Sequence, residues 1–238
     1  MKHIVILSFN QYIGSALFNK LQISDNNVEY LYLTPNNAFF DLPEDLDTVV
    51  VVPRCDSFSS WLEIEEYEKM FISDLINDVN KTNEKAKVIY ISNSLNFSDI
   101  DSFSKDSMLR IEEKLKESIR NLYIIKVGEI FGEKQVPTSY NSFASICLSI
   151  ANETPIEDVL LSKTRIFTYL EDVLFCVQNT INNDKNTLKT IDIGKEFEYK
   201  KINNLLSQFN ECFKNNKKPN FIDTTEENMF KVFSWYKS

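Results

Sequence analysis

The sequence predicts an α/β protein built on a doubly wound, Rossmann-like parallel sheet, with a small C-terminal α+β lobe of the kind that binds substrate. Strand-like apolar runs alternate with amphipathic segments over residues 3–127, which is the order that right-handed βαβ crossovers produce. Four consecutive valines at 49–52 indicate a strand that is covered on both faces, as the strands of parallel sheets are. Together these two observations predict the fold class.

Each element of the first part follows from its apolar pattern. Continuous or alternating apolar runs predict strands at residues 3–7, 28–33, 48–52, 87–92 and 122–127. Apolar residues at helical spacing predict helices at residues 13–21, 61–79 and 108–119. On the last of these helices, we expect Met108, Ile111, Leu115 and Ile119 to face inward and Arg110, Glu112, Glu113 and Lys116 to face outward.

The pattern loosens after about residue 132. We therefore divide the chain into a Rossmann-like domain, residues 1–132, and a small lobe, residues 133–238, one strand of which can join the main sheet. In this lobe we expect helices at 140–152, 171–181, 199–213 and 224–236, and strands at 165–169 and 187–193.

The last expected helix carries two local signals. Thr224 and Glu227 have the spacing of a capping box, and Met229, Phe230, Phe233 and Tyr236 fall on one helical face. We expect this apolar face to pack inside the lobe. The alternative is a surface that binds a partner.

Composition excludes several classes of function. A net charge of −9 argues against nucleic acid as a partner, and the one basic cluster, residues 214–218, is interpreted as a solvated loop. No apolar run reaches the length of a membrane span, so we expect no membrane partner. The four cysteines show no CxxC pattern, which favours reduced thiols in the cytoplasm. His3 is the single histidine, so we expect it to be structural and expect no metal site.

Five segments, taken in order, carry a resemblance to a known family. They are VILSFNQYIGSAL (5–17), VIYISNS (88–94), LYIIKVGEIFG (122–132), PTSYNSFASICLSIANETPI (137–156) and RIFTYLEDVLFCV (165–177). The chain resembles the extended short-chain dehydrogenase/reductases of the NAD-dependent epimerase/dehydratase type, which act on nucleotide sugars. Residues 137–156 are similar to the reductases that finish UDP-linked deoxy-amino sugars for bacterial capsules. The resemblance implies a nucleotide-sugar ligand, NAD(P) as cofactor and a role in surface-polysaccharide biosynthesis.

The resemblance also implies a set of site residues. Ser94 lies at the position of the catalytic serine, and Tyr140 and Asn141 lie where related reductases contact the sugar nucleotide. The cofactor contacts at the turn would be Gln11, Tyr12, Ile13 and Gly14. Arg54 stands where the family has small residues; its guanidinium fork can bind a phosphate, and the alternative is a solvent-facing arginine. Glu129 stands where the family has an uncharged residue, so it would repel a diphosphate unless it is neutralised.

Three sites depart from the family pattern: the phosphate turn, the ribose contact and the catalytic dyad. Ser8, Gln11 and Gly14 occupy the glycine positions of the phosphate turn, and of these only Gly14, which close helix–strand packing requires, is retained. Thr34 stands where an acidic residue would contact the ribose. Ser104 and Met108 occupy the places of the Tyr-x-x-x-Lys dyad, which supplies acid–base catalysis.

These departures leave the cofactor undetermined and disfavour ordinary hydride transfer. Two hypotheses remain open. The first is an epimerase/reductase-like enzyme that acts on a nucleotide sugar with atypical chemistry. The second is a catalytically silent, dehydrogenase-like binding subunit that acts with a protein partner. A homodimer is compatible with either hypothesis.

Overall fold

The structure is a computed structural model that describes residues 1–24, 26–34, 40–53, 61–93, 102–136, 142–156, 164–183 and 189–237. The chain forms two compact units. The first unit contains the described residues within 1–92, 100–126 and 174–192, and the second contains those within 93–99, 127–173 and 193–238. The chain therefore enters and leaves each unit more than once.

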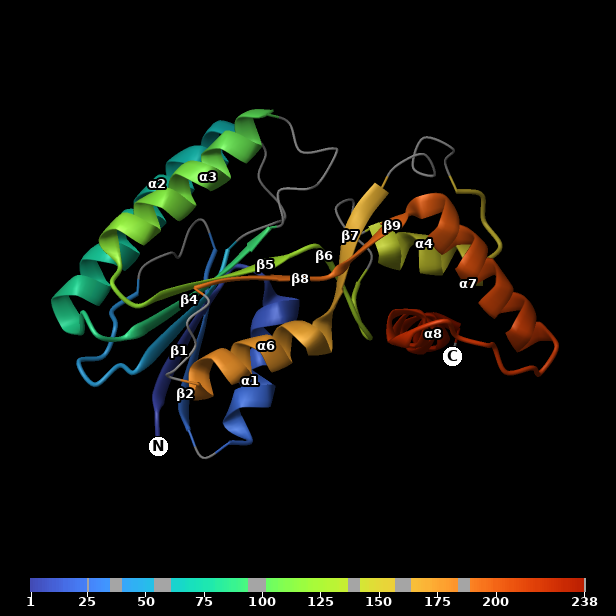
Figure 1. The fold of residues 1–238 in the computed structure, drawn as a ribbon, viewed down its shortest axis with the longest axis horizontal. Coiled ribbons are helices and arrows are strands. Elements are labelled where there is room, and N and C mark those ends of the chain that lie inside the picture. Colours follow the sequence, from blue (N-terminus) through green and yellow to red (C-terminus); the bar gives the residue numbers. More distant parts are fainter. Residues whose placement is uncertain are drawn as a thin grey trace. The chain divides into compact units, whose positions relative to one another are not determined.

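The first unit is built on a mostly parallel six-stranded sheet (Figure 1). Its strands are β1 (His3–Ser8), β2 (Asn27–Tyr32), β3 (Thr48–Val52), β4 (Lys87–Asn93), β5 (Leu122–Val127) and β8 (Thr190–Ile193), in the order β2-β1-β3-β4-β5-β8. Strand β1 pairs in parallel with β2 on one side and with β3 on the other. The Rossmann-like fold class predicted from the sequence is confirmed.

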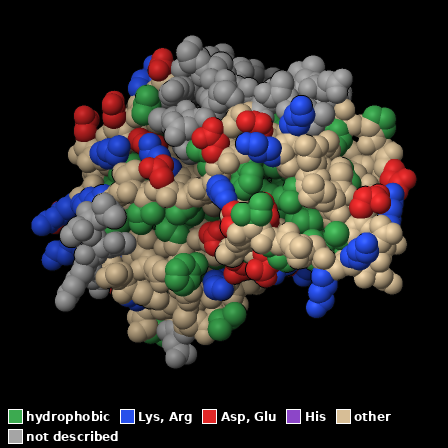
Figure 2. Space-filling view, turned by 45° about the vertical axis from the view of Figure 1, so that its right-hand side comes forward, with side chains coloured by type: hydrophobic (Ala, Val, Ile, Leu, Met, Phe, Trp, Pro, Cys, Tyr) green, Lys and Arg blue, Asp and Glu red, His purple; other side chains and the backbone are tan. Residues whose placement is uncertain are grey.

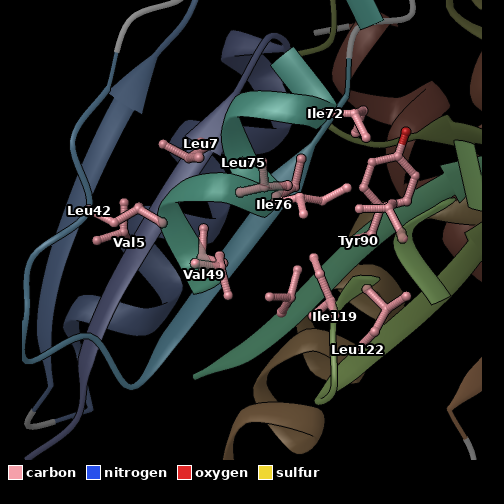
Figure 3. Packing of buried hydrophobic residues seen from close by; sticks show 14 of the residues in the cluster. Val5, Leu7, Leu42, Val49, Ile72, Leu75, Ile76, Tyr90, Ile119 and Leu122 are labelled. Atoms are coloured by element: carbon pink, nitrogen blue, oxygen red, sulfur yellow. The ribbon is translucent and has the colours of Figure 1, made fainter. Parts of the chain in front are cut away.

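Helices cover both faces of this sheet (Figure 1). Helices α2 (Trp61–Thr82) and α3 (Ser102–Ser118) lie on one face, and α1 (Gln11–Gln22) and the later part of α6 (Leu170–Asn182) lie on the other. In Figure 3, Ile72, Leu75 and Ile76 of α2 lie over sheet residues such as Leu7 and Val49. The apolar runs that predicted the strands thus form the core of this unit.

Helix α3 begins six residues earlier than the sequence pattern predicted. It starts at Ser102 rather than Met108, because the polar stretch 102–107 contains neither glycine nor proline and so offers nothing to end a helix. The predicted start was wrong because it followed the apolar stripe alone.

Two lysines of the sheet hold the carboxyl end of α6. Lys87, which is buried, donates from Nζ to the carbonyl oxygens of Thr180 (2.6 Å) and Ile181 (3.2 Å). Lys2 donates from Nζ to the same Ile181 oxygen at 2.6 Å. The last carbonyls of a helix lack partners within the helix and carry partial negative charge. The lysines therefore satisfy these carbonyls and fix α6 to the sheet.

The second unit is an α+β arrangement around a three-stranded sheet. Its strands are β6 (Glu129–Phe131), β7 (Thr164–Tyr169) and β9 (Lys195–Glu198), in the order β6-β7-β9, and its described helices are α4 (Ser142–Ala151), α7 (Tyr199–Lys214) and α8 (Thr224–Lys237). Strand β7 is parallel to β6 and antiparallel to β9. The two short outer strands were not expected from the sequence, because each has only three or four residues.

The core of the second unit is rich in aromatic side chains. Its fully buried members include Phe131, Phe143, Phe167, Tyr199 and Phe233. The apolar face of α8 belongs to this core: Met229 and Phe233 are fully buried, and Phe230 and Tyr236 pack against them. The prediction that this face packs inside the lobe is confirmed.

The N-cap of α8 lies one residue before its predicted place, and the return bond of Glu226 goes to the amide before the N-cap rather than to that of the N-cap itself. Asp223 Oδ1 accepts a hydrogen bond from the Glu226 amide (3.0 Å), and Glu226 Oε2 accepts one from the Ile222 amide (2.8 Å). The prediction of Thr224 and Glu227 was wrong because Asp223 and Glu226 have the same spacing, and aspartate is the stronger N-cap.

Thr168 of β7 bonds to the backbone just before β6 and at the end of β8. Its Oγ1 accepts from the Gly128 amide at 2.8 Å and donates to the Ile193 oxygen at 3.0 Å. A Cβ at Gly128 would lie 2.1 Å from the Ile166 oxygen. Gly194 has a φ of +128°, which side chains disfavour. Glycine is therefore required at both places where the chain passes strand β7.

Candidate functional site

The order of strands in the first unit defines a position for a ligand. Strand β2 pairs with one edge of β1, and the chain then crosses to place β3 at the other edge, so the strand order reverses at β1. In open α/β sheets, ligands bind beyond the carboxyl ends of the strands at such a reversal. Here the edge is formed by the end of β1 at Ser8, the end of β3 at Val52 and the start of α1 at Gln11. The sequence predicted the phosphate turn at this place.

Side chains close the turn between β1 and α1 from within. Ser8 is fully buried, and its Oγ donates to the Asn10 oxygen (2.7 Å) and accepts from the Asn10 amide (3.2 Å). Asn10 is the N-cap of α1, and its Oδ1 accepts from the Ile13 amide at 3.0 Å. A helix N-terminus binds anions through such amides. The Ile13 amide already has a partner inside the protein.

Gly14 has the packing role that the sequence predicted. A Cβ at this position would lie 2.6 Å from both Cβ and Oγ of Ser8 and 2.7 Å from a ring carbon of Tyr30. The Gly14 amide donates to the Asn10 oxygen at 2.9 Å, as it does in a regular first helical turn. Close approach of α1 to the sheet therefore explains this glycine without any ligand.

The other predicted contacts of the turn lie at the start of α1. Gln11 is exposed, Tyr12 is half-buried and Ile13 is buried. Thr34, at the position of the ribose contact, is half-buried just after β2. These placements put Gln11 at the surface of the turn, where its side chain can meet an approaching phosphate.

Four predicted site residues lie outside the described part of the chain. They are Arg54, Ser94, Tyr140 and Asn141. The catalytic and substrate-binding predictions therefore stay predictions. The two dyad positions, 104 and 108, both lie within α3, and Met108 is half-buried.

Glu112 of α3 is buried, which corrects the prediction that it faces outward. Its side chain is 2% exposed. Oε1 accepts from Ser92 Oγ at 2.7 Å, and Oε2 lies 3.2 Å from Lys126 Nζ. A buried carboxylate requires such partners. The sequence held the signal, because 108, 112, 115 and 119 also form a helical stripe, in which a glutamate takes the second place.

Glu129 has partners in the second unit that the sequence did not reveal. Its Oε1 accepts from the Phe143 amide at the start of α4 (2.7 Å), and its Oε2 accepts from the Tyr199 hydroxyl (3.0 Å). Both donors favour the charged carboxylate. The negative charge of Glu129 is therefore stabilised within the unit.

Other described features lie away from this edge. A pocket of about 460 Å³ is lined by residues 116–120, 122, 124, 189 and 190, near the amino end of β5, and it includes no predicted site residue. His3 lies at the amino end of β1, where Nδ1 is 2.9 Å from Asp45 and Nε2 is 2.8 Å from Glu29. These contacts hold the His3 ring between two carboxylates.

Two further expectations concern metals and membranes. Among the described residues, no group of His, Cys, Asp and Glu side chains could hold a metal ion. Cys147, Cys176 and Cys212 are free thiols. Within the same residues, no helix combines the length and apolar character needed to cross a bilayer.

No family model and no curated protein matches the sequence. Solved structures do resemble the chain. CapF of Staphylococcus aureus, a capsular polysaccharide assembling protein, matches with a TM-score of 0.73 and 16% identity over 98% of this chain and 64% of CapF. A dTDP-glucose 4,6-dehydratase from Bacillus anthracis, in complex with NAD, matches with a TM-score of 0.73 and 11% identity over 100% of this chain and 97% of that one.

A third structure binds a nucleotide sugar. The UDP-N-acetylglucosamine 4-epimerase of Methanobrevibacter ruminantium, in complex with UDP-N-acetylmuramic acid, matches with a TM-score of 0.73 and 15% identity over 99% of this chain and 98% of that one. The chain therefore has the fold of the nucleotide-sugar epimerases and dehydratases, as the resemblance predicted. It spans 64% of the length of CapF.

Proposed function

We propose that the protein binds a nucleotide sugar in bacterial surface-polysaccharide biosynthesis and does not perform ordinary NAD(P)-dependent hydride transfer. The first part is supported by the structures that resemble it, one a capsular polysaccharide assembling protein and another an epimerase with a UDP-sugar bound. The second part is carried by the closed turn between β1 and α1.

The turn does not fit a dinucleotide pyrophosphate as it stands. A pyrophosphate binds where glycines let it approach free amides at the start of the helix. Here Asn10 Oδ1 takes the Ile13 amide, and the buried Ser8 hydroxyl holds the Asn10 backbone. A phosphate would have to displace the Asn10 side chain before it could bind that amide.

The residues that replace the dyad also argue against ordinary hydride transfer. Neither Ser104 nor Met108 can supply the acid and the cation of a Tyr-x-x-x-Lys pair, because serine is a weak acid and methionine carries no charge. Acid–base catalysis is worth about 10²–10⁴-fold in rate. Its loss would leave ordinary hydride chemistry very slow.

On the substrate side, Tyr140 and Asn141 are proposed as contacts to the sugar nucleotide, Arg54 as a phosphate ligand and Ser94 as the reacting or positioning hydroxyl. The sequence raised one objection to a diphosphate, which was the charge of Glu129. The hydrogen bonds from the Phe143 amide and the Tyr199 hydroxyl favour the charged carboxylate and do not neutralise it, so the diphosphate is expected to bind away from Glu129.

Calorimetric titration with UDP, UDP-N-acetylglucosamine, NAD and NADPH tests the proposal. We expect the uridine ligands to bind and the two dinucleotides not to bind. Tyr140→Phe and Asn141→Ala should each weaken uridine-ligand binding by about three- to tenfold, the worth of one hydrogen bond. Tight binding of NAD or NADPH to the wild-type protein would contradict the closed turn.

A variant that restores the glycine pattern is the matched control. In Ser8→Gly/Gln11→Gly, the hydroxyl that holds the turn and the side chain at its surface are both removed. We expect this variant to gain NAD binding while its uridine-ligand affinity stays unchanged. If the wild-type protein binds no nucleotide at all, the silent-subunit hypothesis replaces the proposal. That hypothesis has lost the support of the apolar face of α8, which is buried.

A further inference from the structure

The connection between α7 and α8 presents apolar side chains at the surface of the second unit. We call residues 213–222 the α7–α8 tip. Ile222 is 89% exposed, and Phe213 and Phe221 are 36% and 38% exposed. The two rings pack against Phe230, with ring centroids 5.3 and 5.4 Å away. The tip is therefore an apolar surface that rests on the aromatic core.

Hydrogen bonds hold the backbone of the tip at both ends. At the end of α7, Asn216 has a φ of +55°, the Lys217 amide donates to the Cys212 oxygen and the Asn216 amide donates to the Phe213 oxygen, as in a Schellman motif. At the start of α8, the Ile222 amide donates to Glu226 Oε2. The exposure of Ile222 therefore belongs to an ordered turn.

The tip itself, residues 213–222, contains three lysines and no acidic residue. Lys214 pairs with Glu153 (2.9 Å) and Glu211 (3.3 Å). The carboxylate of Asp223 pairs with Lys195. Lys217 and Lys218 are exposed, and no ion pair joins either of them to another residue in the described part of the chain. Lys214 is thus shared by two carboxylates, whereas Lys217 and Lys218 lie beside the apolar side chains.

We propose that the α7–α8 tip docks on an anionic lipid surface. An apolar side chain that projects between lysines is suited to the membrane interface, where the side chain enters the acyl boundary and the lysines meet anionic headgroups. Ile222 stands out from the surface rather than lining a groove, which favours a fluid apolar layer over a rigid protein partner. The net charge of −9 acts weakly at the tip, because charges more than about 10 Å away are screened.

This inference goes beyond the proposed function and does not depend on it. From the sequence we expected no membrane partner, because no apolar run has the length of a span and the basic cluster was interpreted as a solvated loop. Figure 2 shows hydrophobic side chains at the surface, with charged ones around them. What the structure adds is the position of the basic cluster beside exposed Phe213, Phe221 and Ile222.

Flotation of the full chain with lipid vesicles tests the proposal. We expect binding to vesicles of phosphatidylglycerol and phosphatidylcholine, and little binding to phosphatidylcholine alone. Ile222→Ser should weaken vesicle binding by about tenfold, because it removes the apolar side chain that would enter the bilayer. Ile23→Ser is the matched control, since Ile23 is 85% exposed in the first unit, and it should leave binding unchanged.

The lysines are tested separately from the apolar contact. Lys217→Glu/Lys218→Glu should lower the affinity for anionic vesicles by at least about fivefold for each lysine. Lys81→Glu/Lys85→Glu makes the same change of net charge at an exposed helix end and should have little effect. Ile222→Trp should still bind, and the fluorescence of the new tryptophan should shift to the blue when anionic vesicles are added, because its ring would enter the bilayer. Absence of binding to anionic vesicles at low salt would overturn the proposal, as would equal loss in the tip variants and their controls.

Discussion

The two units enclose a carboxylate by different means. In the first unit, Glu112 is held by side chains: the hydroxyl of Ser92, the ammonium of Lys126 at 3.2 Å and that of Lys116 at 3.7 Å. In the second unit, Glu129 is held in part by the backbone, through the amide of Phe143 at the start of α4. A side-chain partner and its carboxylate can both be substituted in one variant. A backbone amide cannot be removed by substitution.

The crowded glycines show the same difference. A Cβ at Gly14, in the first unit, would meet side-chain atoms of Ser8 and Tyr30. A Cβ at Gly128, in the second unit, would meet the backbone oxygen and carbon of Ile166 at 2.1 and 2.4 Å. Damage in the first unit should therefore be open to rescue by a second substitution, and damage in the second unit should not.

The largest effect is expected at the buried ion pair. Lys126→Met would leave the buried Glu112 with the half-exposed Lys116, 3.7 Å away, as its remaining cation. Loss of one partner of a buried pair costs about 3–5 kcal/mol, and Lys116 should hold the cost near the lower end of this range. Glu112→Gln in the same chain should recover most of the loss, because the amide needs no counter-charge and can still accept from Ser92. Urea unfolding of the two single variants and the double variant measures both quantities. The comparison would be contradicted if Lys126→Met lowered the free energy of unfolding equally in the wild-type and the Glu112→Gln backgrounds.

The glycines should give the next largest effects. Gly128→Ala is expected to destabilise by about 3 kcal/mol and Gly14→Ala by about 1–3 kcal/mol, which is the range for forced overpacking. Ser8→Gly should reduce the cost of Gly14→Ala, since it removes the atoms that lie 2.6 Å from the new Cβ.

A side-chain change should reduce the cost of Gly128→Ala only slightly, because the two nearest atoms belong to a peptide group and the third, Ile166 Cγ2 at 2.7 Å, is also present in valine. A reduced cost in the Ile166→Val background would show that the backbone of β7 moves, and would break the distinction between the two units. Thermal or urea unfolding of the single and double variants makes this measurement.

A smaller effect is expected from the side-chain donor to Glu129. Tyr199→Phe keeps the fully buried ring and removes only the hydroxyl that Glu129 Oε2 accepts from. We expect a loss of about 1–2 kcal/mol, because the amide bond from Phe143 stays in place. Tyr32→Phe, at a ring that is 46% exposed, should change stability by less than about 0.5 kcal/mol. Equal values for the two variants in urea unfolding would show that the hydroxyl of Tyr199 adds nothing.

The sequence predicted the first unit better than the second, for a physical reason. Strands such as β3 consist of apolar residues that must be buried wherever they lie, so their pattern is visible locally. Strands β6 and β9 are short and partly charged, and they form because Gly128 and Gly194 let the chain pass β7 closely. That contact joins residues far apart in the sequence, and no local pattern records it.

The candidate site shows the same limit. The closed turn was visible as Ser8 and Gln11 at glycine positions, but the capping of Ile13 by Asn10 required the geometry. Glu112 was assigned outward because glutamate is usually solvated. Its partner, Lys126, lies on another element and could not be paired with it from helical periodicity.

The smallest effect is expected at His3, which tests a side-chain contact of the first unit by pH. Burial lowers the pKa of His3, but the hydrogen bonds and charges of Asp45 and Glu29 outweigh it, so the pKa is raised above its ordinary value of 6.5. The folded protein therefore holds this proton more tightly than the unfolded chain does. The stabilisation is fully present below the ordinary pKa and is lost as pH rises through the raised pKa.

Urea midpoints measured from about pH 5.5 to 8.5 should thus fall with rising pH in the wild-type protein, and fall less in His3→Gln. Asp45→Asn should flatten the same profile, since it removes one of the two carboxylates that raise the pKa. Tyr199→Phe should keep the wild-type slope, because its contact with Glu129 belongs to the second unit. An unchanged slope in His3→Gln would show that the ring and its two carboxylates add no pH-dependent stability, and that this side-chain cluster serves packing alone.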